Sequence, residues 1–125
     1  MITALVSVVL FVHGFVHLPV WLAPTGGDGP FDPRHSWALA AAGVPGPRVA
    51  GAASIGLASV TSMLYVIAGA AVAVQSGGRP AAALLAACVG LLLKTLWFNP
   101  WLSLGVLLDV GVVVAVLTGW PASLY

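Results

Sequence analysis

Four long runs of apolar residues, separated by short breaks, dominate the chain. The runs cover residues 2–23, 48–75, 81–98 and 101–120. A helix that crosses the ~30 Å hydrocarbon core of a bilayer needs roughly 17–25 mostly apolar residues, and each run reaches that range. The pattern therefore predicts an all-α integral membrane four-helix bundle that forms one domain over residues 1–125.

Proline, glycine and asparagine mark the breaks between the runs. Residues 24–30 read Pro-Thr-Gly-Gly-Asp-Gly-Pro, residues 76–80 read Ser-Gly-Gly-Arg-Pro, and Asn99-Pro100 precedes the last run. These residue types favour turns. Residues 36–44 are apolar but too short to cross a bilayer, so we expect a short interfacial helix before the second span, with Ser36 as its N-cap. The second run exceeds the bilayer thickness and should tilt or project beyond it.

Composition supports a membrane protein and excludes some partners. Hydrophobic residues make up 61% of the chain and charged residues 6%, whereas a soluble domain is typically about 25% charged. Four Lys and Arg residues cannot form the basic patch that nucleic-acid binding requires. There is no Gly-rich phosphate loop, so no nucleotide is expected. The first run lacks a basic segment and a cleavage site, which favours a retained helix over a signal peptide.

Four spans place both termini on one side of the membrane. Arg34 and Arg48 lie in the loop between the first two spans, and Arg79 lies in the next loop. Three arginines are too few for the positive-inside rule to decide which side that is. The bias toward Gly, Ala, Val and Pro looks actinobacterial, and we expect the protein to be located in the bacterial inner membrane.

Several polar residues lie at similar depths within the predicted spans. At ~1.5 Å per residue, His17 and His13 lie about 9 and 15 Å from the end of the first span. By the same rise Asp109 lies about 12 Å, Lys94 about 6 Å and Ser54 about 9 Å from the same face of the membrane. Ionisable residues at such depths are costly and usually face the bundle interior or a water-filled cavity. We therefore predict that these side chains, which come from all four spans, form one intramembrane site.

The spacing of His13 and His17 raises the question of a metal. Residues four apart lie on one helical face, and two histidines so placed can bind one metal ion. Asp109 at matching depth would complete a site of His13, His17 and Asp109 for zinc or copper. Alternatively, an Asp109–Lys94 ion pair and interhelical hydrogen bonds could simply hold the helices together.

The segment His13-Gly14-Phe15-Val16-His17-Leu18 resembles the first helix of small, uncharacterised bacterial membrane proteins that carry His-Gly-x-x-His-Leu. In that group the last helix opens with a short Trp-containing turn, followed by Gly, apolar residues and Asp or Asn. Residues 97–101, Trp-Phe-Asn-Pro-Trp, followed by Gly105 and Asp109, are similar. The resemblance implies a four-helix membrane fold and supports the choice of polar residues, and it implies no activity.

Three classes of function remain open at this point. The first is a membrane protein whose His/Asp/Lys site binds or conducts a small cation, either a proton or a transition metal. It predicts a hydrated cavity around His13, His17 and Asp109. The second is a membrane-embedded enzyme that uses His and Asp as acid and base on a lipid-soluble substrate. It predicts an apolar pocket that opens sideways to lipid and has the histidines at its end.

The third class is a non-catalytic subunit or assembly partner, which predicts a dry and fully paired cluster. Small residues on the second span would let another helix approach closely. These residues are Gly51, Ala52, Gly56 and Ser59. We accordingly expect a homo-oligomer or a membrane complex, whichever function applies.

Overall fold

A computed structural model describes residues 1–22, 29–44 and 46–124. The elements are α1 (Ile2–Trp21), α2 (Trp37–Ala41), α3 (Pro47–Ala73), α4 (Arg79–Leu96), the 3₁₀ turn η1 (Pro100–Leu102), α5 (Ser103–Thr118) and the 3₁₀ turn η2 (Ala122–Leu124). No strand occurs in these residues. Helices α1, α3 and α4, and the segment Pro100–Thr118, are long and apolar enough to cross a membrane. The predicted all-α fold with four spans and a short helix before the second is confirmed.

The predicted element ends are close to the observed ones. Pro47 opens α3 and Pro80 lies in the first turn of α4, where a missing N–H costs nothing. The hydroxyl of Ser36 accepts a hydrogen bond from the Leu39 amide at 3.1 Å, so the predicted N-cap of α2 is confirmed. The predicted end of the first span at residue 23, the turn up to residue 28 and Pro45 lie outside the described residues.

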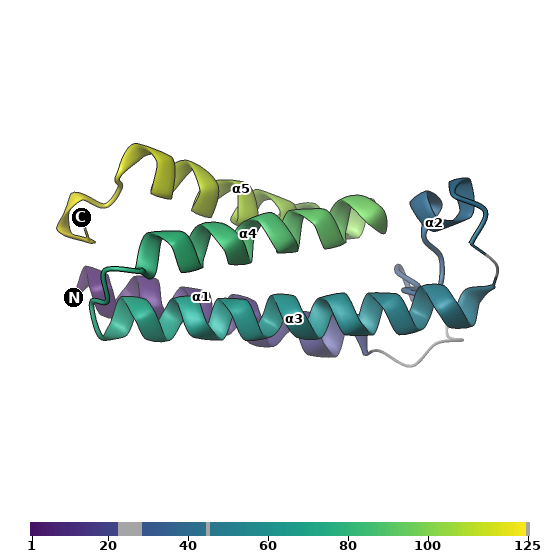
Figure 1. Ribbon diagram of the computed structural model, residues 1–125, viewed down its shortest axis with the longest axis horizontal. Helices are drawn as coiled ribbons and strands as arrows, with labels where there is room; N and C mark the ends of the chain where they lie inside the picture. The colour runs from purple at the N-terminus through teal and green to yellow at the C-terminus, as the bar shows by residue number, and fades with distance from the viewer. Residues whose placement is uncertain (23–28, 45, 125) are drawn as a thin grey trace.

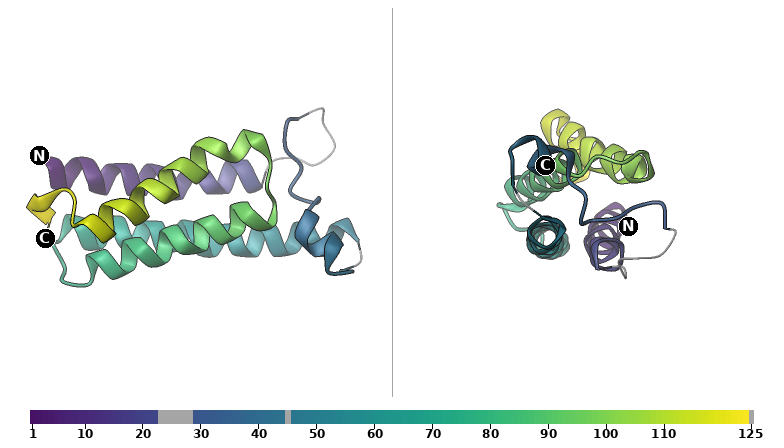
Figure 2. Two further views of the ribbon diagram at one scale, coloured as in Figure 1. Left: turned by 90° about the horizontal axis from the view of Figure 1, so that it is seen from above. Right: turned by 90° about the vertical axis from the view of Figure 1, so that its right-hand side faces the viewer.

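The spanning helices pack in chain order (Figure 1). Helix α1 packs along α3, α3 along α4, and α4 along α5, whereas α1 and α5 do not pack closely against each other. Helix α5 runs obliquely across the bundle (Figure 2). Both termini lie at the same end of the bundle, as predicted (Figure 1). The bundle is therefore tightly packed at the α1–α3, α3–α4 and α4–α5 contacts and more open between α1 and α5.

Helix α3 projects beyond its neighbours at the end opposite the termini (Figure 1). Its 27 residues span ~40 Å, more than a bilayer core. Trp21, the last residue of α1, belongs to the same buried cluster as Ala58, so about ten residues of α3 extend ~15 Å beyond α1. Ser36 and Trp97 fasten the loop beside this projection, because their side chains donate to the carbonyls of Leu96 and Pro33.

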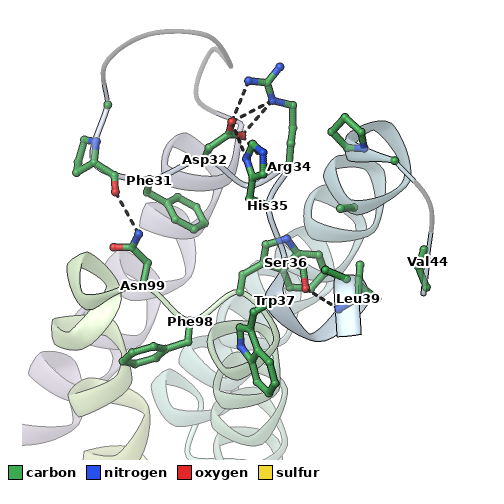
Figure 3. A pocket seen from close by; sticks show the side chains of 17 residues that line it. Phe31, Asp32, Arg34, His35, Ser36, Trp37, Leu39, Val44, Phe98 and Asn99 are labelled. Carbon is green, nitrogen blue, oxygen red and sulfur yellow. Dashed lines mark hydrogen bonds and ion pairs between the residues drawn. The ribbon is translucent and has the colours of Figure 1, made fainter. Parts of the chain in front are cut away.

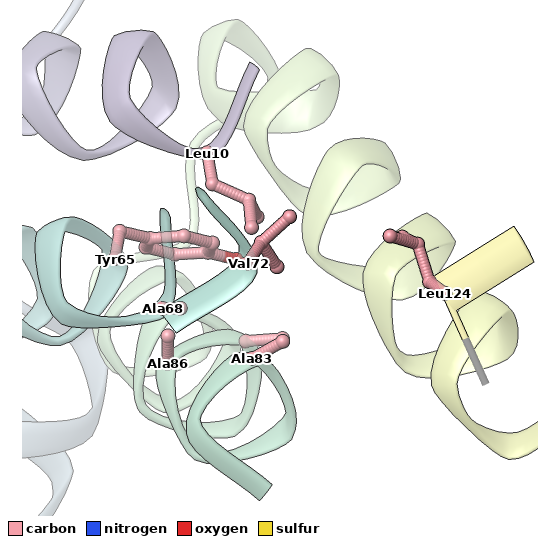
Figure 4. Close-up of a cluster of buried hydrophobic side chains, with 8 residues drawn as sticks. Leu10, Tyr65, Ala68, Val72, Ala83, Ala86 and Leu124 are labelled. Atoms are coloured by element: carbon pink, nitrogen blue, oxygen red, sulfur yellow. The ribbon is translucent and has the colours of Figure 1, made fainter. Parts of the chain in front are cut away.

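Small side chains let the helices approach closely. In the cluster of Figure 4, Ala68, Ala83 and Ala86 bring α3 and α4 together around Tyr65. A Cβ added at Gly14 would lie 2.9 Å from the Cβ of Tyr65, so α1 and α3 are nearly in backbone contact there. Such packing, rather than burial from water, holds helices together in lipid.

The Gly14 contact gives a stability prediction. We expect Gly14→Ala to destabilise the protein by roughly 1–3 kcal/mol, because the new methyl group must push α1 away from α3. Gly111→Ala is the matched control, since a Cβ there meets nothing within 4 Å. Thermal unfolding in detergent measures both. Equal melting temperatures for the two variants would contradict the close packing.

Candidate functional site

Asp109 joins all four spanning helices through one carboxylate. It is the only buried residue of α5. Its Oδ1 accepts from the Tyr65 hydroxyl of α3 at 2.5 Å and from Nε2 of His13 of α1 at 2.8 Å. Its Oδ2 accepts from the Lys94 ammonium of α4 at 2.8 Å. Three donors, one of them charged, are what an ionised carboxylate needs at this depth.

Lys94 extends the network to His17. Its Nζ also donates to Nε2 of His17 at 2.8 Å, and a third contact to the Gly90 carbonyl is long at 3.5 Å. Nδ1 of His17 lies 2.8 Å from the His13 carbonyl oxygen. Because a carbonyl can only accept, Nδ1 of His17 carries the proton and Nε2 is free to accept from Lys94. The opposite charges of Lys94 and Asp109 balance.

Two glycines make room for the ion pair. A Cβ at Gly90 would lie 2.7 Å from Oδ2 of Asp109, and one at Gly105 would lie 2.6 Å from Cε of Lys94. Each glycine therefore sits against the charged side chain of the other helix. The approach of α4 to α5 depends on both missing side chains.

One nitrogen of the cluster is left open. Nε2 of His13 carries a proton, because its partner is a carboxylate oxygen. Among the described residues, Nδ1 of His13 has no hydrogen-bond partner, whereas every buried side-chain nitrogen and oxygen there has one. Nδ1 is therefore accessible, and in the neutral ring it is a hydrogen-bond acceptor.

A cavity of about 320 Å³, which His13 helps to line, opens between α1 and α5. Its polar wall consists of His13, His17 and Lys94. The other lining residues are apolar or aromatic: Val16, Val20, Trp21, Trp101, Leu102, Leu104, Gly105 and Leu108. Leu104 and Val16 are exposed on the outer surface of the bundle, so the cavity faces the lipid sideways. We call it the head cavity.

The structure brings together four of the five residues predicted to share a site. His13, His17, Lys94 and Asp109 are linked, but Ser54 is not, because its hydroxyl donates to the Gly51 carbonyl of its own helix at 2.8 Å. The sequence reasoning missed Tyr65. Counted from Arg48, Tyr65 would lie ~26 Å deep, but the projection of α3 shifts it to the level of His13.

Two of the three predicted metal ligands, His17 and Asp109, contact the ammonium group of Lys94. Lys94 Nζ lies 2.8 Å from both His17 Nε2 and Asp109 Oδ2, where a metal shared by these atoms would have to sit. Within residues 1–22, 29–44 and 46–124, no three His, Cys, Asp or Glu side chains are grouped so that they could hold a metal ion. Zinc or copper binding stays a prediction.

A second polar group lies on the projecting end of the molecule (Figure 3). Asp32 pairs with Arg34 at 2.9 Å and with His35 at 3.1 Å, at the edge of a cavity of about 760 Å³. The hydrogen bonds from the Arg34 side chain lower the pKa of Asp32 to about 2. This group stabilises the loop and lies apart from the cluster around Asp109.

Comparisons of the chain with protein-family models, with curated proteins and with solved structures gave no match.

The ion pair gives a testable energetic prediction. We expect Lys94→Met and Asp109→Asn each to destabilise the protein by roughly 3–5 kcal/mol. Each substitution removes one charge of the pair and leaves the opposite charge unpaired in an apolar environment. The double variant should lose clearly less stability than the two single variants added together, since it leaves neither charge unpaired. Unfolding in mixed micelles measures the cycle, with Thr118→Ala on the exposed end of α5 as a control. Additive losses would show that Lys94 and Asp109 act independently.

Proposed function

We propose that the protein binds a neutral, lipid-soluble hydroxyl compound in the head cavity and exchanges a proton with it through His13. The observation that carries this proposal is an apolar cavity, open sideways to lipid, with His13 and Lys94 in its wall. That is the arrangement expected of acid–base chemistry on a membrane-soluble substrate. The small cation handled at the site is then a proton.

The His13–Asp109 pair has the form of a positioned general base. A carboxylate that accepts from one ring nitrogen fixes the tautomer and stabilises the imidazolium that forms when the other nitrogen takes a proton. Here Nε2 of His13 donates to Oδ1 of Asp109 over a distance of 2.8 Å, and Nδ1 of His13 is left without a partner among the described residues. In the proposed step the ligand O–H bond breaks, an Nδ1–H bond forms on His13, and the ligand keeps the electron pair as an oxyanion.

Lys94 is placed to stabilise that oxyanion. Lys94 lines the same cavity, and the third contact of its ammonium, to the Gly90 carbonyl, is long at 3.5 Å. The N–H of the ammonium that makes this long contact can therefore turn to the ligand, and the hydrogen bonds to Asp109 and His17 stay in place. The imidazolium and oxyanion formed together keep the net charge of the site unchanged, which matters at a depth where an unbalanced charge is costly.

Two other hypotheses make different predictions. A metal site requires Lys94 to leave its position between His17 and Asp109. A purely structural cluster agrees with the complete pairing of the buried polar atoms, but it leaves the cavity that His13 lines without a role. Assembly into a homo-oligomer or larger complex is compatible with all three.

The metal hypothesis can be separated by thermal unfolding. We expect added zinc or copper to leave the melting temperature of the wild type unchanged, because Lys94 blocks the shared position. Lys94→Met frees His17 and Asp109, so that variant should be stabilised by zinc, since a metal that binds the folded state raises its stability. Lys94→Met/His17→Ala is the control. Stabilisation of the wild type would support a metal site and contradict the proton proposal.

A hydroxynaphthoquinone that is neutral when free in the assay buffer tests proton exchange directly, because its deprotonated form absorbs visible light. With the protein in lipid nanodiscs, the probe should bind saturably to the wild type, quench Trp21 or Trp101 in the cavity wall, and develop the absorbance of its anion. His13→Gln keeps a donor to Asp109 but removes the base. It should bind the probe with little anion absorbance.

A matched pair of variants checks the location. Val16 lines the cavity whereas Val12, one turn earlier, does not, and both are about half exposed. Val16→Phe should abolish binding and Val12→Phe should not. Binding that survives Val16→Phe, or anion absorbance that survives His13→Gln, would contradict the proposed function.

A further inference from the structure

A second cavity continues the head cavity along the same side of the bundle. It measures about 380 Å³ and is also lined by α1 and α5, with Leu108 common to both. Its α1 residues lie between Leu5 and Leu10, and its α5 residues between Leu107 and Val116. These segments directly follow those of the head cavity toward the end that carries the termini. We call it the tail cavity.

The walls of the tail cavity are apolar along its length. The charged residue among them, Arg79, is already used, because its guanidinium donates to the backbone carbonyls of Leu124, Gln75 and Ser76. Gly111 widens the cavity, since a Cβ there would meet nothing within 4 Å. A hydrocarbon chain suits this surface, and a polar group would lose hydrogen bonds on entering it.

The head cavity limits what such a chain can carry. His13 lies ~12 Å below Trp21 at the end of α1, deeper than a phospholipid head group can reach without leaving the interface. The charges of Lys94 and Asp109 already balance, so a phosphate or carboxylate head would add an unpaired charge within the membrane. A neutral hydroxyl head can donate to Nδ1 of His13 and accept from Lys94.

On the basis of the proposed function, we propose that the ligand is a single-chain lipid with a neutral hydroxyl-bearing head, of the prenylated quinol type. The head lies against His13 and Lys94, and the isoprenoid or alkyl chain runs down the tail cavity between α1 and α5. The open side of the bundle between these helices is thereby the entrance for a ligand from the lipid phase.

Two probes with one head group test the chain separately from the head. One hydroxynaphthoquinone carries a long alkyl chain and the other a methyl group. In Gly111→Phe a ring fills the tail cavity, so affinity for the long-chain probe should fall by about tenfold or more, the effect expected of overpacking. Affinity for the methyl probe should stay at the wild-type value. Val114→Phe, on the exposed face of the same helix, should change neither.

Each outcome decides one claim. Unchanged long-chain affinity in Gly111→Phe, with both probes binding to the wild type, would overturn the tail cavity and leave the proposed function standing. An equal loss of both probes would also overturn it, because the substitution would then act on the head site. If neither probe binds to the wild type, the proposed function fails and the tail assignment fails with it.

Discussion

The carboxylate of Asp109 is the interaction on which the bundle depends. Helix α5 buries no other side chain, and its apolar surface would be as well solvated by lipid as by protein. The hydrogen bonds from His13, Tyr65 and Lys94 connect this helix to α1, α3 and α4. Because leaving any of these groups unpaired in an apolar medium is costly, one residue fixes both the depth and the rotation of α5.

The same constraint produces the candidate site. Since α5 is fastened at Asp109 and packs along α4, it does not close against α1, and the two cavities follow on that side. Asp109 also holds His13 in the tautomer that leaves Nδ1 accessible. The carboxylate that connects the helices is therefore also the group that orients His13, the base of the proposed function, in the wall of a cavity open to lipid.

The sequence predicted the fold and most of the cluster, and the reason for its failures is specific. Apolar run length sets the four spans, and the cost of burying His13, His17, Lys94 and Asp109 forces them together. Ser54 was wrongly grouped with them and Tyr65 was missed because depth was counted from the start of α3, which projects beyond the other helices. The positions of the cavities could not be predicted, because they depend on which pair of helices fails to pack.

Nitrogen-15 NMR of histidine-labelled protein in lipid bilayers tests the central claim most directly. Signals from the two membrane histidines can be assigned with His13→Gln and His17→Gln, and His35 can be removed by substitution. The hydrogen bonds place a proton on Nε2 of His13 and on Nδ1 of His17, and the proposed function predicts that both rings are neutral and therefore opposite tautomers. A His13 ring protonated on Nδ1 alone would contradict the account, because Asp109 would then hold no proton of His13 and the cavity would face no base.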